Sequence, residues 1–375
     1  MSLVLAPLGL LYGAAVRTRL GLYRSGLLKT QKVGVPVISV GNVTAGGTGK
    51  TPLVEWVARA LASDGRRACV LTRGYGRADE SKRVVASDGV RVLADVGECG
   101  DEPRLLAERL VGAASVVCDR DRVAAALWAR ESLSADVFVL DDGFQHLRIA
   151  RDLDIVAVDA SAPWGGGRLL PRGRLREPRE GLRRAGCVVI TRADMAEDLE
   201  GLRAEVLRLT EGETAVIAAR VRTLGLGPVD SSPGEARVEL ESDAGKASLE
   251  SDVGKASFES DVGGALLESV AARPVAAFCA VGNPRAFFTQ LRRDGFDLRC
   301  ERAFPDHHSF ARAELEEFAR EAEREGARAL LTTAKDAVKL RSIRLSLPCY
   351  VVEVDLEFDD EEKLMSLVRE TARRV

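Results

Sequence analysis

The chain has 375 residues, of which 46% are hydrophobic and 30% are charged, and its formal net charge is −3 at pH 7. This length is sufficient for two α/β domains, each with its own core. The small net charge gives no electrostatic reason to expect nucleic-acid binding, so we predict no nucleic-acid partner. The seven cysteines are scattered and include no Cys-x-x-Cys pair, which is typical of a protein from a reducing compartment.

The first 35 residues differ in composition from the rest. Residues 3–16 are uncharged and mostly apolar, the charges that follow are all basic, and the first acid is Glu55. Pro7, Gly9 and Gly13 interrupt the stretch, which is shorter than the about 20 apolar residues that cross a hydrocarbon core. Residues 1–35 are either a helix packed on the domain or an interfacial segment among anionic headgroups. We favour the interfacial segment, which predicts an anionic membrane surface as a partner.

Residues 37–52 predict a nucleotide site. An apolar run leads into a glycine-rich loop that ends in Gly-Lys-Thr. Glycines let such a loop close around a polyphosphate, the lysine adds a positive charge, and the threonine hydroxyl suits Mg²⁺. The strict G-x-x-x-x-G-K-[ST] pattern fails by one residue, because Thr44 stands where its first glycine would be. The residues predicted to bind a nucleoside triphosphate are Asn42, Thr44, Ala45, Gly46, Gly47, Thr48, Gly49, Lys50 and Thr51.

Short apolar runs alternate with helical stretches along most of the chain. The first series has predicted strands at 37–40, 69–72, 115–118 and 137–140, and helices at 52–62, 103–111 and 122–132. A second series of strands follows at 155–158, 187–191, 215–219, 275–280, 329–332 and 350–354. This alternation predicts an α/β fold with parallel sheets whose sites lie at the carboxyl ends of the strands. We predict a P-loop NTPase-like domain over 36–150 and a second, smaller α/β domain over 151–375.

A near-repeat occupies residues 241–267, with a period of nine residues and Glu-Ser-Asp at the start of each copy. Small and polar residues predominate, so this segment cannot bury a core of its own. We interpret the stretch at about 228–268 as a flexible surface insertion in the second domain.

Acidic residues at the end of a predicted strand indicate a metal site. Asp141 and Asp142 follow the strand 137–140, where a P-loop domain places the acid that orients Mg²⁺. Two adjacent carboxylates repel each other, and a cation would relieve that repulsion. Gln145 lies close enough in sequence to reach the same ion. The alternative is a polar turn after a core strand.

Three other polar segments are ambiguous on local sequence alone. Asp101, in the segment Gly-Asp-Glu-Pro, is either a cap of the helix 103–111 or a functional acid. His307, in Asp-His-His, is either a loop histidine or part of a carboxylate–histidine unit that handles protons. The arginines of the loop 164–178, including Arg176, either bind a phosphate or carboxylate or face solvent.

Taken in order, these segments resemble the tetraacyldisaccharide 4′-kinases, the lipid A 4′-kinases of Gram-negative bacteria. The motifs that carry the resemblance span residues 39–340, and in one of them Ala334 replaces the family's usual glutamate. They are the phosphate loop, Thr-Arg-Gly-Tyr-Gly-Arg from Thr72, Gly-Asp-Glu-Pro from Gly100, Asp-Asp-Gly-Phe-Gln-His from Asp141, Leu-Arg-Glu-Pro from Leu175, Pro-Asp-His from Pro305 and Thr-Thr-Ala-Lys-Asp from Thr332.

The resemblance implies transfer of the ATP γ-phosphate to the 4′-hydroxyl of a tetraacylated glucosamine disaccharide 1-phosphate, with ATP and Mg²⁺ as cofactors. It places the protein at the cytoplasmic face of the bacterial inner membrane and implies two α/β/α domains joined by a short ribbon, with no obligatory protein partner. The alternative class is a regulatory NTPase of the MinD or metallochaperone type that acts on a protein partner. Ala45 stands in place of the signature loop lysine of that class.

The resemblance also implies roles for individual residues. Asp101 is implied to be the base that takes the proton of the sugar hydroxyl, with His307 in support and Lys50 on the phosphates. Because Asp101 and His307 fall in different predicted domains, domain closure is expected to assemble the site. The candidates for holding Mg²⁺ are Thr51, Glu102, Asp141, Asp142 and Gln145. The candidates for binding the lipid substrate are Arg73, Arg176 and Glu177.

Overall fold

The computed structural model describes residues 2–229, 266–267, 269–271, 273–341 and 343–374. They form two compact units, Met1–Arg222 with Asp355–Val375 as unit 1 and Thr223–Val354 as unit 2. The chain passes from one unit to the other within strands β8 (Ala215–Pro228) and β12 (Cys349–Phe358). This division differs from the predicted domains 36–150 and 151–375, because the strands predicted to open the second domain pair with the sheet of the first.

Unit 1 is built on a mostly parallel sheet with the strand order β8-β7-β6-β1-β5-β2-β4-β3. Its other strands are β1 (Val37–Asn42), β2 (Ala68–Thr72), β3 (Val84–Ser87), β4 (Ala114–Cys118), β5 (Val137–Asp141), β6 (Leu153–Asp159) and β7 (Cys187–Thr191). The register places Val40 opposite Asp141, so β1 and β5 end side by side. The edge strand β3 runs antiparallel to β4 and was not predicted from the sequence.

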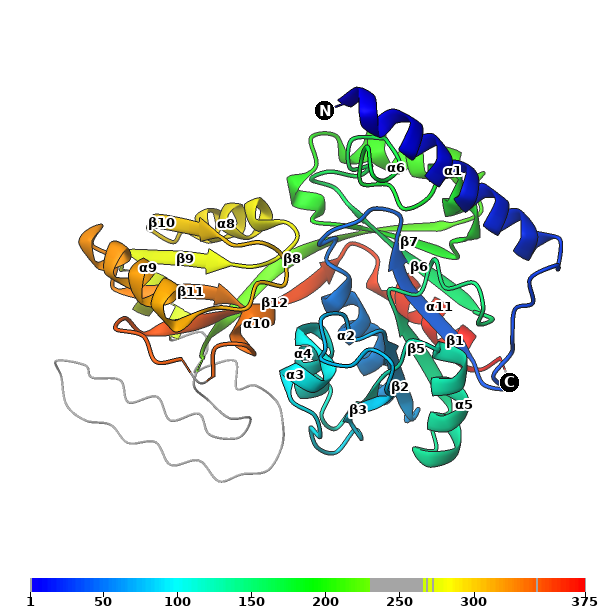
Figure 1. The fold of residues 1–375 in the computed structure, drawn as a ribbon, viewed down its shortest axis with the longest axis horizontal. Helices are drawn as coiled ribbons and strands as arrows, with labels where there is room; N and C mark the ends of the chain where they lie inside the picture. Colours follow the sequence, from blue (N-terminus) through cyan, green and yellow to red (C-terminus); the bar gives the residue numbers. More distant parts are fainter. Residues whose placement is uncertain (1, 230–265, 268, 272, 342, 375) are drawn as a thin grey trace. The chain divides into compact units, whose positions relative to one another are not determined.

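Helices cover both faces of this sheet (Figure 1). They are α1 (Ser2–Arg24), α2 (Lys50–Ser63), α3 (Val96–Cys99), α4 (Asp101–Arg109), α5 (Arg122–Ser132), α6 (Leu199–Leu209) and α11 (Glu361–Ala372), with short 3-10 helices η1 (Arg179–Arg184) and η2 (Ala193–Met195). Helices α2, α4 and α11 share one core with Ile38 and Val40 of β1. Helix α5 packs on the opposite face against Phe138 and Leu140 of β5. The α/β architecture predicted for the phosphate-loop region is therefore confirmed.

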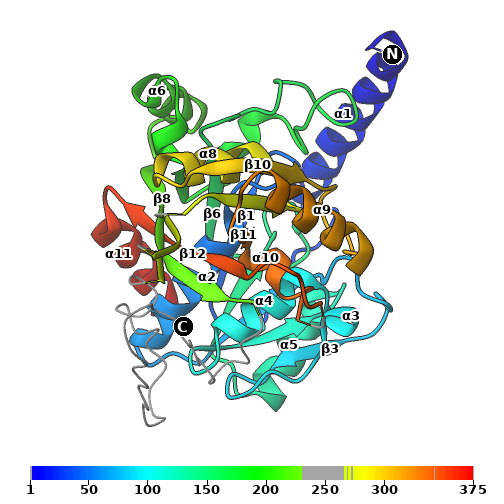
Figure 2. The same cartoon turned by 90° about the vertical axis from the view of Figure 1, so that its left-hand side faces the viewer.

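The C-terminal helix α11 packs on α2, as Figures 1 and 2 show. Trp56 of α2 makes an edge contact with Phe358, with ring centroids 5.1 Å apart, and its Nε1 donates to Glu361 at 3.0 Å. Leu364 and Val368 of α11 are fully buried in the same core. The C-terminal helix therefore belongs to the core of unit 1.

Unit 2 has a smaller parallel sheet in the order β10-β9-β11-β12, with helices on both faces. Its elements are β9 (Val275–Cys279), α8 (Pro284–Arg293), β10 (Leu298–Ala303), α9 (Arg312–Arg324), β11 (Ala329–Thr333) and α10 (Ala334–Ala337). Helix α8 packs with Val275 and Ala277 of β9, and α9 packs with Ala276 and Phe278 on the other face.

The predicted insertion at about 228–268 falls mainly on residues 230–265, which lie outside the described residues. Its predicted ends are too wide, because Val229 and Leu266 are buried in the cores of unit 2. A deletion that removes the repeat therefore has to stop before Leu266.

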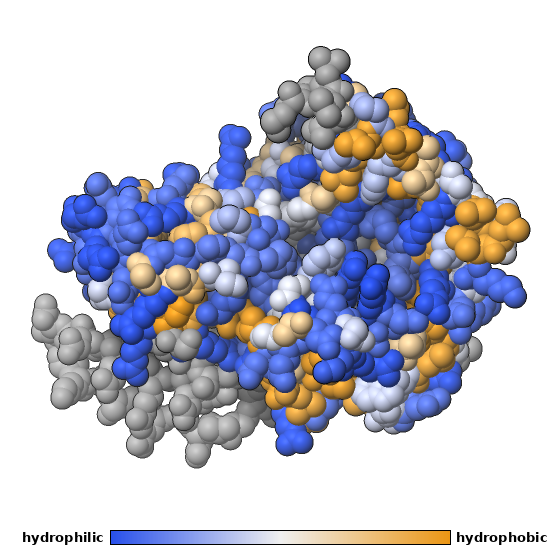
Figure 3. Space-filling view, in the orientation of Figure 1, coloured by the Kyte–Doolittle hydropathy of each residue, from blue (hydrophilic) through white to orange (hydrophobic). Residues whose placement is uncertain are grey.

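Helix α1 packs on unit 1 and also exposes apolar side chains. The Tyr12 hydroxyl donates to the Arg176 carbonyl at 2.8 Å, and the Arg19 guanidinium donates to the Gln145 carbonyl at 3.1 Å. Leu8, Leu10 and Leu11 are 48%, 76% and 67% exposed, and Figure 3 shows hydrophobic surface over this helix. Among the described residues, no helix is long and apolar enough to cross a membrane.

Candidate active site

The predicted phosphate loop joins β1 to α2 at the carboxyl edge of the sheet. Gly46 and Gly49 have φ values of +107° and +76°, a backbone region that glycine enters without steric cost. Gly49 is the N-cap of α2, so Lys50 and Thr51 open the helix. The Asn42 amide donates to the Thr48 hydroxyl at 2.8 Å across the loop. The loop therefore has the form of an anion cradle at a helix N-terminus.

Residues 43–45 of the phosphate loop pair with residues 174–176 of the loop that carries several arginines. Thr44 and Leu175 form an antiparallel bridge. On either side of it, the Ala45 N–H donates to the Arg174 carbonyl at 2.6 Å and the Arg176 N–H donates to the Val43 carbonyl at 2.8 Å. This short ladder fixes the backbone of Arg176 next to the phosphate loop. The local sequence gave no sign of the pairing.

Asp142 follows β5 and lies between two cations. Its carboxylate is 3.2 Å from Lys50 Nζ and 2.7 Å from an Arg176 guanidinium nitrogen. Burial alone would raise the pKa of Asp142, but Lys50 and Arg176 outweigh burial and hold that pKa well below its usual range. Asp142 is therefore ionised and forms an ion pair with each cation.

Asp141 has the opposite electrostatic environment. It is 6% exposed and accepts a hydrogen bond from the Thr72 hydroxyl at 2.9 Å. Burial, followed by repulsion from Glu102 and Asp142, raises the pKa of Asp141 to about 6. The site thus has an excess of negative charge at Asp141, which an oxygen-binding cation such as Mg²⁺ would relieve.

The carboxylates at this edge suit Mg²⁺ better than they suit a metal ion whose ligands all come from the protein. Among the described residues, no cluster of three or more His, Cys, Asp or Glu side chains has the geometry of a metal site. Mg²⁺ commonly uses one or two carboxylates and takes its remaining ligands from water and phosphate. The adjacent Asp141 and Asp142 meet that requirement at the edge where the phosphate loop lies.

Gln145 and Glu177 are hydrogen-bonded to each other next to Asn42, at the start of the phosphate loop. The Gln145 amide donates to the Asn42 carbonyl at 2.8 Å and to the Glu177 carboxylate at 2.7 Å. Glu177 is 1% exposed and also pairs with Arg184 at 2.9 Å. The two oxygens of Glu177 are thus engaged inside the protein, and this residue orients Gln145.

Asp101 is the first residue of α4 and is 6% exposed. The N-cap of this helix is Gly100, so the cap interpretation of Asp101 is wrong. One Asp101 oxygen accepts the N–H of Glu102 at 2.9 Å. The influence of Glu102 on the pKa of Asp141 brings the start of α4 into the same electrostatic neighbourhood as the paired acids.

Two further arginines lie directly after β2 and at the start of α5. Arg73 lies over the Tyr75 ring at 4.9 Å and is 3.9 Å from Glu80. Arg122 is 5% exposed at the start of α5, and attraction from Asp141 and Asp142 partly offsets the burial that lowers the pKa of Arg122. No sequence motif pointed to Arg122, and the only available signal was its position directly after a strand–loop–helix junction.

His307 lies in unit 2, where two of the sequence motifs meet. It has a positive φ of 61°. Lys335 Nζ is 3.2 Å from His307 Nε2 and 3.1 Å from the Asp306 carboxylate. His308 instead contacts Glu314 at 2.7 Å. The adjacent histidines thus have different partners.

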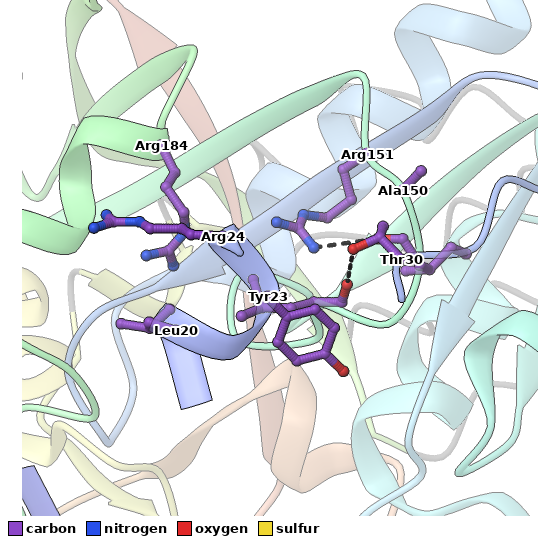
Figure 4. Close-up of a pocket in the computed structure, with 9 residues that line it drawn as sticks. Leu20, Tyr23, Arg24, Thr30, Ala150, Arg151 and Arg184 are labelled. Carbon is purple, nitrogen blue, oxygen red and sulfur yellow. Dashed lines mark hydrogen bonds between the residues drawn. The ribbon is translucent and has the colours of Figure 1, made fainter. Parts of the chain in front are cut away.

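A pocket lies beneath the C-terminal half of α1 in unit 1 (Figure 4). It is an apolar hollow edged by arginines, between α1 and the segment that follows Gln145. Its lining residues are Leu20, Tyr23, Arg24, Thr30, Leu147, Ile149, Ala150, Arg151 and Arg184. Because Arg184 also pairs with Glu177, this hollow borders the residues that orient Gln145.

Comparison with known proteins assigns this site to a family. Residues 1–373 match the family described as tetraacyldisaccharide-1-P 4′-kinase. The chain belongs to this family. The tetraacyldisaccharide 4′-kinase of Anaeromyxobacter sp. (strain Fw109-5) is 44% identical over 362 residues, which cover 95% of this chain and 88% of that protein. That of Geobacter metallireducens is 38% identical over 367 residues, 97% of this chain and 96% of that protein.

A solved member of the family has the same fold. The crystal structure of LpxK from Aquifex aeolicus in complex with ATP is 30% identical, with a TM-score of 0.70, and the match covers 97% of both chains. The family resemblance and the P-loop NTPase-like fold predicted from the sequence are therefore confirmed, and the alternative class of regulatory NTPase is not favoured.

We expect Asp141→Asn to stabilise the protein above about pH 6. The pKa of Asp141 in the folded protein is about 6, above its ordinary value of 3.8. Its ionisation therefore destabilises the fold at high pH, and this penalty is lost as the pH falls and the group is protonated. The gain in free energy of unfolding should be about 1–3 kcal/mol near pH 8 and should shrink between about pH 6 and pH 4.

Urea unfolding followed by tryptophan fluorescence measures this gain, because Trp56, Trp128 and Trp164 all lie in unit 1. Asp136→Asn is the matched control just before the same strand. It removes ion pairs with Arg66 and Arg67 and should give no gain. A variant at Asp141 that is no more stable than the wild type near pH 8 would contradict the electrostatic account.

Proposed function

We propose that the protein transfers the γ-phosphate of ATP to the 4′-hydroxyl of a tetraacylated glucosamine disaccharide 1-phosphate. The observation that carries this proposal is the pairing of Lys50 with Asp142 at 3.2 Å, beside a second acid short of positive charge, in a chain of the tetraacyldisaccharide 4′-kinase family. Phosphoryl transfer requires positioning and charge neutralisation more than covalent chemistry by the protein. Cations, carboxylates and a phosphate loop on one sheet edge meet these requirements.

The nucleotide is proposed to bind at the phosphate loop. Lys50 and the N–H groups from Gly46 to Thr51 would hold the β- and γ-phosphates. Mg²⁺, when bound, neutralises charge on those phosphates. The residues that would hold it are Thr51, Glu102, Asp141, Asp142 and Gln145.

Asp142 forms ion pairs with the cations that an anionic ligand would use. Lys50 and Arg176 both contact its carboxylate. We propose that Arg176, with Arg73, binds the phosphate of the lipid substrate, and that Glu177 acts through Gln145.

Asp101 is proposed as the base that accepts the proton of the sugar hydroxyl, and His307 as the group that supports it. Lys335 can only donate, so His307 Nε2 accepts from it and the neutral ring carries its proton on Nδ1. In this tautomer the Nδ1–H is a hydrogen-bond donor that suits a carboxylate.

The activity is tested by incubating the purified protein with ATP, Mg²⁺ and an acylated glucosamine disaccharide 1-phosphate. Mass spectrometry of the lipid should show the gain of one phosphate. Lys50→Ala removes the charge at the loop and should abolish most of this gain. A folded wild-type protein that binds ATP and leaves the lipid unmodified would refute the proposal.

Asp101→Ala should lower kcat by about 10²–10⁴-fold, the range for lost general-base catalysis, with the KM for ATP nearly unchanged. Steady-state kinetics with saturating lipid measure both parameters. The control is Asp198→Ala, since Asp198 caps α6 by accepting the Gly201 N–H at 2.8 Å. It should cost about 1 kcal/mol of stability without lowering kcat. A kcat close to that of the wild type in the Asp101 variant would remove Asp101 from the role of base.

The same proposal includes a peripheral location at the cytoplasmic face of the inner membrane, with α1 as the contact. The exposed Leu8, Leu10 and Leu11 supply an apolar surface, and Arg17 and Arg24 on the same helix are exposed cations suited to anionic headgroups. Helix α1 also touches the backbone of Arg176 and Gln145. Substitution of the leucines is therefore a cleaner test than removal of the whole helix.

Replacing Leu8, Leu10 and Leu11 together by Ser should weaken co-sedimentation with anionic phospholipid vesicles by about tenfold or more, from the apolar area withdrawn. The KM for lipid in vesicles should rise, while turnover of lipid in detergent micelles should stay near that of the wild type. Replacing the exposed Leu127 and Leu207 of α5 and α6 by Ser is the control. Unchanged partitioning of the triple variant would contradict membrane contact through α1.

A further inference from the structure

Two consecutive side chains at the end of β7 donate hydrogen bonds to consecutive carbonyl groups of the phosphate loop. The Thr191 hydroxyl donates to the Thr48 carbonyl at 2.8 Å. The Arg192 guanidinium donates to the Gly47 carbonyl at 3.0 Å. Both donors come from the strand end two positions across the sheet from β1.

These contacts decide where the loop's N–H groups point. A peptide group is planar and trans, so its C=O and the following N–H point in opposite directions. The hydrogen bond from Arg192 to Gly47 therefore fixes the direction of the Thr48 N–H. The hydrogen bond from Thr191 to Thr48 fixes that of the Gly49 N–H in the same way. A phosphate cradle depends on such N–H groups facing the anion.

Arg192 is held in place by a buried ion pair. Its guanidinium is 2.5 Å from the Asp159 carboxylate, and the two side chains are only 15% and 6% exposed. The other Asp159 oxygen accepts from the N–H and hydroxyl of Ser161 at 3.1 and 2.7 Å. Since the acid neutralises the arginine, the pair adds little net charge to the cradle.

The backbone conformation of Arg192 is a second observation that accompanies the contact with Gly47. Its φ is +52°, in the left-handed region that non-glycine residues seldom adopt. That conformation follows directly after β7 and accompanies a side chain that bridges Asp159 and Gly47.

We propose that Arg192, oriented by Asp159, is a positioning residue for the phosphate loop. It sets the affinity for the ATP phosphates through the Gly47–Thr48 peptide group and does not touch the reacting atoms. Neither residue belongs to a motif that the family resemblance used, and their role is distinct from that of Lys50.

The test uses the full chain with Arg192→Ala and titration with methylanthraniloyl-ATP. The Kd should rise about tenfold or more, as expected when a hydrogen bond to a charged group is lost. The KM for ATP should rise in parallel, while the KM for lipid and the kcat at saturating ATP stay near wild-type values. Arg192→Lys keeps one donor near the Gly47 carbonyl and should recover part of the affinity.

Arg203→Ala is the matched control. Arg203 likewise joins a backbone carbonyl, that of Val216 at 3.0 Å, to a carboxylate, that of Asp359, within unit 1. It should lower thermal stability and leave the Kd unchanged. The proposal is overturned if Arg192→Ala keeps the wild-type Kd, if both alanine variants raise it equally, or if the KM values for ATP and lipid rise together.

Should Arg192→Ala fail to fold, Asp159→Asn provides the same test. It preserves the size of the side chain and removes the charge that orients Arg192. The Kd for methylanthraniloyl-ATP should then rise by a smaller factor in a folded protein. An unchanged Kd in this variant would also overturn the proposal.

Discussion

The parallel pairing of β1 with β5 and β6 is the constraint on which the site depends. Its register sets Val40 beside Asp141 and Asn42 beside Ala157, so the phosphate loop and the paired acids leave the sheet at one edge. Gly41 permits this closeness, because a Cβ there would lie 2.5 Å from the side chain of Phe144. A shift of one residue in this register would turn alternate side chains to the other face and separate the acids from the loop.

Charge balance within this edge follows from the same arrangement. Buried charges are costly unless they are paired, and Lys50 and Arg176 find their partner in Asp142. Asp141 has Lys50 as its main attractive influence, but burial and then repulsion from the neighbouring acids outweigh it, and the pKa of Asp141 rises accordingly. A charged ligand that binds at this edge would therefore replace a contact that the charged side chains already make with one another. Such a preformed site avoids much of the cost of ordering charged side chains on binding.

Local sequence predicted the elements of the site well and their partners poorly. Apolar runs and helix signals placed 122–132 and 187–191 at the bounds that the structure has. The unit boundary was misplaced, because β6 and β7 look like the opening strands of a new domain until their pairing with β1 is known. The pairing of Thr44 with Leu175 is likewise non-local. The proposed roles of Asp101 and His307 rest on family motifs, since local sequence alone favoured a helix cap and a loop histidine.

The insertion of unit 2 between β8 and β12 has a consequence for synthesis on the ribosome. The core of unit 1 includes Leu364 and Val368, which are translated only after all of unit 2. Until they emerge, the apolar side of α2 lacks the helix that shields it and is a surface for chaperones or for aggregation. All residues of unit 2 are translated before the last segment of unit 1. Unit 2 can therefore complete its fold on the ribosome before unit 1 does, although unit 1 begins the chain.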